Sequence, residues 1–164
     1  MRLFYLLCLA VSPLLLAAET IVVKTKAPQN RNAVFQYRVP KGYDKNRREM
    51  YRVLVIFGGR NTDGKADASG RMGWGEWCDD NRIFLVAPGL KDDNYWEPEL
   101  WSGKALQRAL SQLKRKYNIC TDKILYYGYS AGSQASNLLV HRRFMTEVRT
   151  VQTVACYARA TLKI

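Results

Sequence analysis

Three short apolar runs constrain the fold of this 164-residue chain more than any other feature. They are residues 51–57 (YRVLVIF), 82–87 (RIFLVA) and 123–128 (KILYYG). Near-continuous apolar runs of this length are typical of β-strands that are covered on both faces. Between and after them, the patterns at 68–79, 102–117 and 131–145 predict helices. Strands that alternate with helices favour an α/β fold of three layers, with a mostly parallel sheet.

Two further segments extend this prediction at the ends of the domain. Residues 19–25 and 33–39 flank the turn-forming sequence APQN at 27–30, which predicts an edge hairpin with one solvent-exposed face. Residues 150–157 have the pattern of a fourth strand after the last helix. We therefore expect residues 19–164 to form one partial α/β domain that lacks its carboxyl-terminal strands.

Residues 1–18 have the pattern of a secretory signal peptide. Arg2 provides a positive start, residues 3–11 are apolar, and the small residues Ala17 and Ala18 precede the polar Glu19. A transmembrane anchor is the competing interpretation, but about 16 mostly apolar residues interrupted by a proline are short for a membrane span. We expect cleavage after Ala18, a secreted or periplasmic protein, and no stable membrane span after cleavage.

The cysteines and the single histidine limit the metal and redox chemistry of the chain. Export to an oxidising compartment would allow one disulfide among Cys78, Cys120 and Cys156, but buried free thiols are an equal alternative. The cysteine spacings match no paired C-x-x-C zinc pattern. Because His141 is the single histidine, a site with several histidine ligands is excluded. We expect neither a metal site nor a cofactor.

One motif carries chemistry: residues 128–132 (GYSAG) fit G-x-S-x-G. The motif stands where the predicted strand 123–128 ends and the predicted helix begins, as a nucleophile elbow requires. At such a sharp turn, side chains in place of Gly128 and Gly132 would collide with the neighbouring strand and helix. The pattern predicts Ser130 as a nucleophile and the amide of Ala131 as an oxyanion donor. The alternative is an ordinary strand–helix turn with a capping serine.

Around this motif the sequence resembles the α/β-hydrolase superfamily, in particular secreted esterases of the feruloyl esterase and polyhydroxybutyrate depolymerase type. The resemblance extends from about residue 19 to 157, through YRVLVIF, RIFLVAP and the elbow GYSAGSQAS. In that family a similar early strand ends in His-Gly, and the backbone amide of the next residue completes the oxyanion hole. The resemblance places Arg60 in this role, through its N–H, and Gly58 where the family often has histidine. It implies an ester substrate of plant or polymer origin.

The catalytic triad is incomplete in this chain. An acyl-transferring serine needs a general base and an acid that orients the base, and in α/β-hydrolases both follow the serine. His141 lies along the predicted helix, about 16 Å from the serine backbone at about 1.5 Å per residue. Glu147 is the single acidic residue beyond the elbow. We therefore expect the chain to be the N-terminal part of a larger hydrolase, and to be inactive or nearly so by itself.

The function predicted from the sequence is that of an exported serine hydrolase, most simply a carboxylic ester hydrolase. Two alternatives stay open: a fragment of a serine peptidase of the prolyl-oligopeptidase kind, and a degenerate hydrolase domain that only binds. Residues 59–65 approach a phosphate-binding loop, but residue 66 is alanine where a hydroxyl would hold Mg²⁺. The net charge of +12 comes from short basic clusters without interleaved aromatic residues, so we expect no nucleic-acid partner.

Overall fold

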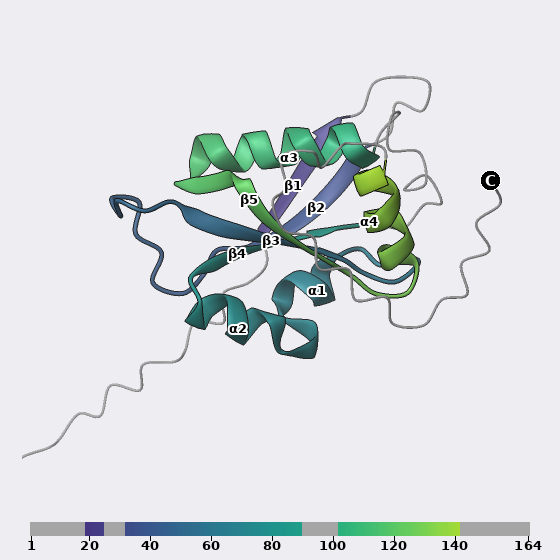
Figure 1. Cartoon of the computed structure of the whole chain (residues 1–164), viewed down its shortest axis with the longest axis horizontal. Helices are drawn as coiled ribbons and strands as arrows, with labels where there is room; N and C mark the ends of the chain where they lie inside the picture. Colours follow the sequence, from purple (N-terminus) through teal and green to yellow (C-terminus); the bar gives the residue numbers. More distant parts are fainter. Residues whose placement is uncertain (1–18, 25–31, 90–101, 142–164) are drawn as a thin grey trace, which may run out of the picture.

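The structure, a computed structural model, describes residues 19–24, 32–89 and 102–141. The elements of this part are β1 (Glu19–Lys24), β2 (Asn32–Arg38), β3 (Tyr51–Phe57), α1 (Lys65–Ser69), the 3₁₀ turn η1 (Arg71–Gly73), α2 (Trp74–Asp80), β4 (Ile83–Pro88), α3 (Ser102–Lys116), β5 (Ile119–Gly128) and α4 (Ala131–His141). Within the described residues the strands form one sheet of five, in the order β1-β2-β4-β3-β5. β3 runs parallel to both β4 and β5, which confirms the predicted α/β class (Figure 1).

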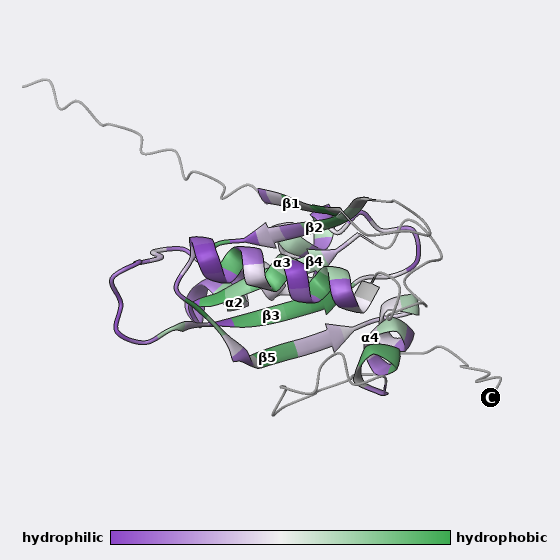
Figure 2. Cartoon of the chain, turned by 90° about the horizontal axis from the view of Figure 1, so that it is seen from above, coloured by the Kyte–Doolittle hydropathy of each residue, from purple (hydrophilic) through white to green (hydrophobic). Residues whose placement is uncertain are grey.

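The two faces of the sheet are buried against different helices, which explains the continuous apolar runs. Figure 1 shows α3 on one side of the sheet and α1 and α2 on the other. In β3, Val53 and Val55 pack with α3 and α4, whereas Leu54 and Ile56 pack on the side of α2. Figure 2 shows β3 as apolar over most of its length, and α3 with alternating polar and apolar bands. Full burial of each such aliphatic side chain contributes about 1.5–3 kcal/mol, so these strands supply much of the core.

The N-terminal hairpin is antiparallel, and β1 forms one edge of the sheet, as predicted. β2 is not an edge strand, because it also pairs with β4, from Phe35 opposite Pro88 to Arg38 opposite Leu85. On one face of this hairpin Val23 and Phe35 are buried in the core beneath α3. The antiparallel hairpin therefore continues the parallel sheet.

Two predicted elements differ from the structure. The helix predicted over 68–79 is wrong in its continuity: Gly70, Met72 and Gly73 have φ values of 114°, 61° and 78°, which a right-handed helix cannot contain. A Cβ on Gly70 would lie 2.9 Å from the Cα of Gly75, so this break is closely packed. β5 begins at Ile119, earlier than residue 123, because it continues past an irregularity in its pairing with β3 to place Ile119 opposite Tyr51.

Several predictions concern residues outside the described ones, namely the signal peptide 1–18, the strand 150–157, Glu147 and Cys156. Cys78 and Cys120 carry free thiols. Burial raises the pKa of the Cys78 thiol to about 12, so this thiol is protonated and inert at neutral pH. Among the helices described, none has both the length and the apolar character to cross a membrane.

Candidate active site

Ser130 lies in the sharp turn between the end of β5 at Gly128 and the start of α4 at Ala131. Its backbone has a φ of 53°, in the left-handed region, and its side chain is exposed. A left-handed conformation costs a non-glycine residue about 1–2 kcal/mol, and such strain is concentrated at functional sites. The structure thus places Ser130 at the strand–helix turn where the motif predicts it.

The two glycines of the motif occupy places that cannot hold a side chain. A Cβ on Gly132 would lie 2.0 Å from the carbonyl oxygen of Phe57 at the end of β3. A Cβ on Gly128 would lie 2.6 Å from the carbonyl oxygen of Gly132 in the first turn of α4. Both distances are far below van der Waals contact. The elbow can therefore pack against β3 only with glycine at both positions.

The loop that follows β3 lies beside Ser130. A Cβ on Gly59 would be 3.8 Å from the Cβ and 4.0 Å from the Oγ of Ser130. Arg60 is the next residue of this loop, and Ala131 begins α4, where the first N–H groups of a helix have no partner within the helix. The fold therefore brings the two segments of the predicted oxyanion donors to the same end of β3 and β5.

Hydrogen bonds within the first turn of α4 hold the strained serine in place. The carbonyl oxygen of Ser130 accepts the hydroxyl of Ser133 at 2.7 Å and the backbone N–H of Ser133 at 3.1 Å. The N–H of Gly132 donates to the carbonyl of Tyr129 at 3.0 Å, and the N–H of Tyr129 donates to the carbonyl of Phe57 at 3.2 Å. Ser133 is buried, so its hydroxyl serves the turn and is not a second exposed nucleophile.

A buried polar cluster beside the elbow was missed by sequence reasoning. Asp67 of α1 is 1% exposed, and its Oδ1 accepts the hydroxyl of Tyr129 at 3.0 Å. Its Oδ2 accepts the hydroxyl of Thr62 at 3.2 Å, and the guanidinium of Arg71 lies 3.9 Å from Oδ1. The sequence offered no signal, because an aspartate in a short polar segment is ordinarily solvated.

The described residues contain no complete triad around Ser130. His141 is exposed at the end of α4, and eleven helical residues span about 16 Å, so the imidazole is beyond hydrogen-bond reach of Ser130. No group of three or more His, Cys, Asp or Glu side chains that could hold a metal ion occurs in the described part of the chain.

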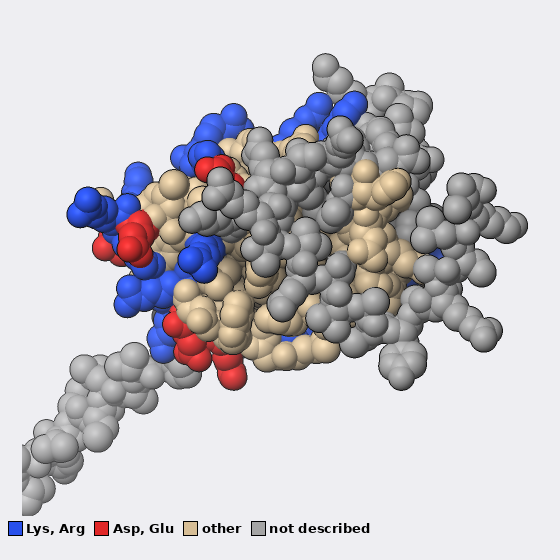
Figure 3. Space-filling view, viewed as in Figure 1, with Lys and Arg blue, Asp and Glu red and all other residues tan. Residues whose placement is uncertain are grey.

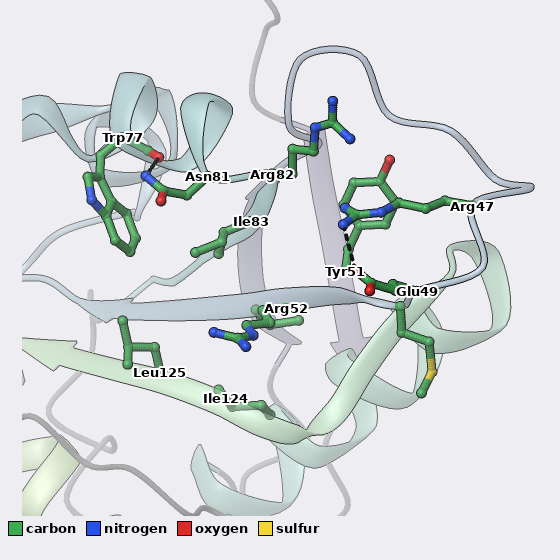
Figure 4. A pocket seen from close by; sticks show the side chains of 12 residues that line it. Arg47, Glu49, Tyr51, Arg52, Trp77, Asn81, Arg82, Ile83, Ile124 and Leu125 are labelled. Carbon is green, nitrogen blue, oxygen red and sulfur yellow. Dashed lines mark hydrogen bonds and ion pairs between the residues drawn. The ribbon is translucent and has the colours of Figure 1, made fainter.

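A cavity of about 750 Å³ lies at the opposite edge of the sheet (Figure 4). It is lined by the beginnings of β3 and β4, whereas Ser130 follows the end of β5. Arg47, Arg52 and Arg82 line this cavity, and the guanidinium of Arg47 lies over the ring of Tyr51 and pairs with Glu49. Because β3, β4 and β5 run parallel, the beginnings of these strands lie on one side of the sheet and their carboxyl ends on the opposite side. This cavity is therefore not part of the site at Ser130.

Basic side chains gather on the same side of the molecule. Figure 3 shows Lys and Arg around the loop between β2 and β3, with acidic side chains among them. The exposed or half-buried charged residues of this loop are Lys41, Asp44, Lys45, Arg47, Arg48 and Glu49. Charges of both signs in an exposed loop are typical of a solvated surface.

No protein-family model and no curated protein matches the sequence. Solved structures do match. The poly(3-hydroxybutyrate) depolymerase LpqC from Bordetella parapertussis is 18% identical with a TM-score of 0.63, over 82% of this chain and 50% of that chain. A ferulic acid esterase is 18% identical with a TM-score of 0.59, over 78% of this chain and 55% of that chain.

A third similar structure is FphF of Staphylococcus aureus, a fluorophosphonate-binding serine hydrolase. It is 8% identical with a TM-score of 0.59, over 84% of this chain and 58% of that chain. This chain thus spans about half the length of these structures. At these identities the likeness establishes the fold, which is the α/β-hydrolase-like fold that the resemblance implies.

Proposed function

We propose that this chain is the N-terminal part of an exported serine hydrolase that cleaves carboxylic esters through an acyl-enzyme on Ser130. The observation that carries the proposal is the exposed Ser130 in a left-handed turn, directly beside Gly59 of the loop after β3. A serine that only capped α4 would need neither the left-handed backbone nor the two glycines without space for a Cβ.

In the proposed reaction, Ser130 Oγ attacks the acyl carbon of the ester while its proton passes to a general base. The N–H groups of Ala131 and Arg60 stabilise the oxyanion that forms. The alcohol leaves with a proton from the same base, and water then hydrolyses the acyl-enzyme. Since His141 is at the far end of α4, the proposal places the base and its acid outside this chain.

The solved structures support the ester class through their names, which include a poly(3-hydroxybutyrate) depolymerase and ferulic acid esterases. By analogy of fold, we propose an ester of plant or polymer origin as the substrate, and secretion or a periplasmic location for the protein. The peptidase alternative predicts cleavage of peptide substrates in place of aryl esters.

The first test is a comparison of two chains that begin at Glu19. One ends at Ile164, and the other continues through any open reading frame found in the genomic DNA downstream of the Ile164 codon. We expect the longer chain to hydrolyse short aryl esters and the shorter one to be inactive or nearly so. Ser130→Ala should reduce the rate of the longer chain about 10⁴-fold or more.

Ser111→Ala is the matched control, because Ser111 is an exposed serine on α3 whose hydroxyl donates to the carbonyl of Gln107. This variant should keep the rate of the unmodified chain. Robust ester turnover by the 164-residue chain, abolished by Ser130→Ala, would contradict the expected incompleteness of the triad. An absence of ester hydrolysis and of fluorophosphonate labelling at Ser130 in both chains would favour the non-catalytic alternative.

A further inference from the structure

Asp67 is a buried carboxylate that the proposed chemistry does not use. A carboxylate that is 1% exposed is costly unless hydrogen bonds or charges compensate the loss of water. An apolar side chain at the same place would avoid that cost. The partners of Asp67 therefore indicate what the carboxylate contributes.

These partners come from both segments of the candidate active site. From the loop after β3, the hydroxyl of Thr62 donates to Oδ2 of Asp67 at 3.2 Å, and Thr62 in turn accepts the N–H of Gly64 at 3.1 Å. From the elbow, the hydroxyl of Tyr129 donates to Oδ1 at 3.0 Å. Tyr129 is the residue directly before Ser130. One carboxylate thus connects the loop to the elbow.

Asp67 also packs directly against the backbone at the start of this loop. A Cβ on Gly58 would lie 2.5 Å from Oδ2 of Asp67 and 2.8 Å from Cγ2 of Thr62. The space of a side chain at residue 58 is thus taken by the carboxylate and by Thr62. With a histidine at 58, Asp67 and Thr62 could not keep these positions.

We propose that Asp67 is a positioning residue, which sets the distance between the loop carrying Arg60 and the elbow carrying Ser130 and Ala131. The proposal rests on the proposed function of Ser130. Oxyanion donors act only when they lie about 2.7–3.1 Å from the oxygen that becomes charged. A misplacement of about 1 Å can cost about 100-fold in rate, so a fixed connection between two separate segments has a direct consequence for catalysis.

The mechanism is geometric, which separates it from an effect of charge. Asparagine at 67 can still accept the hydroxyl of Tyr129 and bond to Thr62, although it loses the charge facing Arg71. Alanine loses both hydrogen bonds. Tyr129→Phe removes the elbow's hydroxyl with little change of volume, and with it both the bond to Asp67 and the bond that the hydroxyl accepts from Arg71 Nη1 at 3.1 Å.

The test measures phosphonylation of Ser130 in the 164-residue chain. The probe is an alkyl fluorophosphonate at about pH 9, where hydroxide and buffer can remove the serine proton without a protein base. The product is quantified by intact mass and peptide mapping, and Ser130→Ala gives the background. We expect Asp67→Ala and Tyr129→Phe to react about 10- to 100-fold more slowly, and Asp67→Asn to stay within about threefold of the unmodified chain.

Asp63→Ala is the control, since Asp63 lies in the same loop but its carboxylate accepts the backbone N–H of Lys65. It should react at the unmodified rate. A folded Asp67→Ala that reacts at the unmodified rate would overturn the proposal. So would Asp67→Asn being as slow as Asp67→Ala. If Asp67→Ala does not fold, Tyr129→Phe decides in its place.

Failure of the proposed function is recognised separately, as a lack of Ser130-dependent labelling both in the 164-residue chain and in the longer chain. The positioning role is then decided by amide hydrogen exchange. We expect Asp67→Ala and Tyr129→Phe to accelerate exchange in residues 58–64 about tenfold or more, with β4 unchanged and with recovery in Asp67→Asn. Exchange in this loop at the rate of the unmodified chain, or faster exchange throughout the molecule, would contradict a positioning role.

Discussion

Ser130 is one of four non-glycine residues described with a positive φ, together with Asn61, Met72 and Arg82. A left-handed backbone alone therefore does not identify a site. Arg82, for example, follows α2 in a common helix-terminal turn, in which its N–H donates to the carbonyl of Asp79. Ser130 differs because the turn that contains it is closely packed: a Cβ on Gly132, two residues later, would lie 2.0 Å from the carbonyl oxygen of Phe57 at the end of β3.

Gly132→Ala tests this lack of space. The new methyl group would lie 2.0 Å from the carbonyl oxygen of Phe57, so α4 and β3 must move apart, and we expect a loss of about 3 kcal/mol or more in unfolding free energy. Gly42→Ala is the control: its φ is 70° but a Cβ there would have nothing within 4 Å, so the loss should be about 1 kcal/mol. Urea unfolding measures both, and equal losses would contradict the packing that we describe.

At the scale of elements, the N-terminal hairpin is attached to the end of α3 by a polar cluster. The hydroxyl of Tyr37 on β2 donates to Glu19 on β1, and Lys116 of α3 donates to Glu19 at 3.0 Å and to the Tyr37 oxygen at 2.9 Å. The hydrogen bond from Tyr37, opposed by some burial and supported by Lys116, lowers the pKa of Glu19. Burial, with the bond to Glu19, raises the pKa of Tyr37.

The lowered pKa of Glu19 predicts a pH dependence of stability. Its contribution is present above the ordinary value of 4.5 and is lost as the pH falls through the lower folded value, because the unfolded chain then binds the proton first. In Glu19→Gln, the free energy of unfolding should therefore fall less steeply below pH 4.5 than in the unmodified chain. The effect should be small, since the side chain is half exposed. Glu76→Gln, at an exposed site on α2, is the control in urea unfolding from pH 3 to 7, and equal acid dependence in the two variants would contradict the cluster's role.

At the scale of the whole molecule, the parallel strands separate two chemically different regions, the candidate active site and the arginine-containing cavity. The ends of β3 and β5 hold the candidate active site, and the beginnings of β3 and β4, with Ile124 and Leu125 of β5, line the arginine-containing cavity. β5 lies at the outside of the described sheet, and the match to the depolymerase covers 82% of this chain but 50% of that chain. Under the proposed function, the base and acid reach Ser130 from residues beyond β5.

Processing of the N-terminus is a prediction for the molecule as a whole. β1 begins at Glu19, directly after the predicted cleavage point, so removal of residues 1–18 would leave the edge strand intact. Expression of the full sequence in an exporting bacterium should yield a protein that starts at Glu19, as found by N-terminal sequencing and intact mass. Ala18→Arg should block processing and Ala27→Arg should not. Retention of residues 1–18 in the exported protein would contradict the signal peptide.

Much of the fold could be predicted because it depends on local patterns. Tyr51–Phe57 is buried on both faces, and any strand of that composition must be covered on both sides. The break between α1 and α2 could not be predicted, since it depends on Gly70 packing against Gly75, and apolar periodicity does not report such a contact. The early start of β5 depends likewise on pairing with Tyr51, a residue far away in the sequence.

By itself, the sequence determined the class of fold, the position of the turn at Ser130 and the need for glycine at 128 and 132, because strand, turn and helix signals are local. The tertiary structure decided that Gly59 lies beside the serine and that the carboxylate of Asp67 fills the space next to Gly58. The contact of Gly59 with Ser130 and the hydrogen bond between Tyr129 and Asp67 join segments that are more than sixty residues apart in the chain. The parallel pairing of β3 with β5 brings the loop after β3 beside the elbow after β5, and no local sequence pattern predicts that pairing.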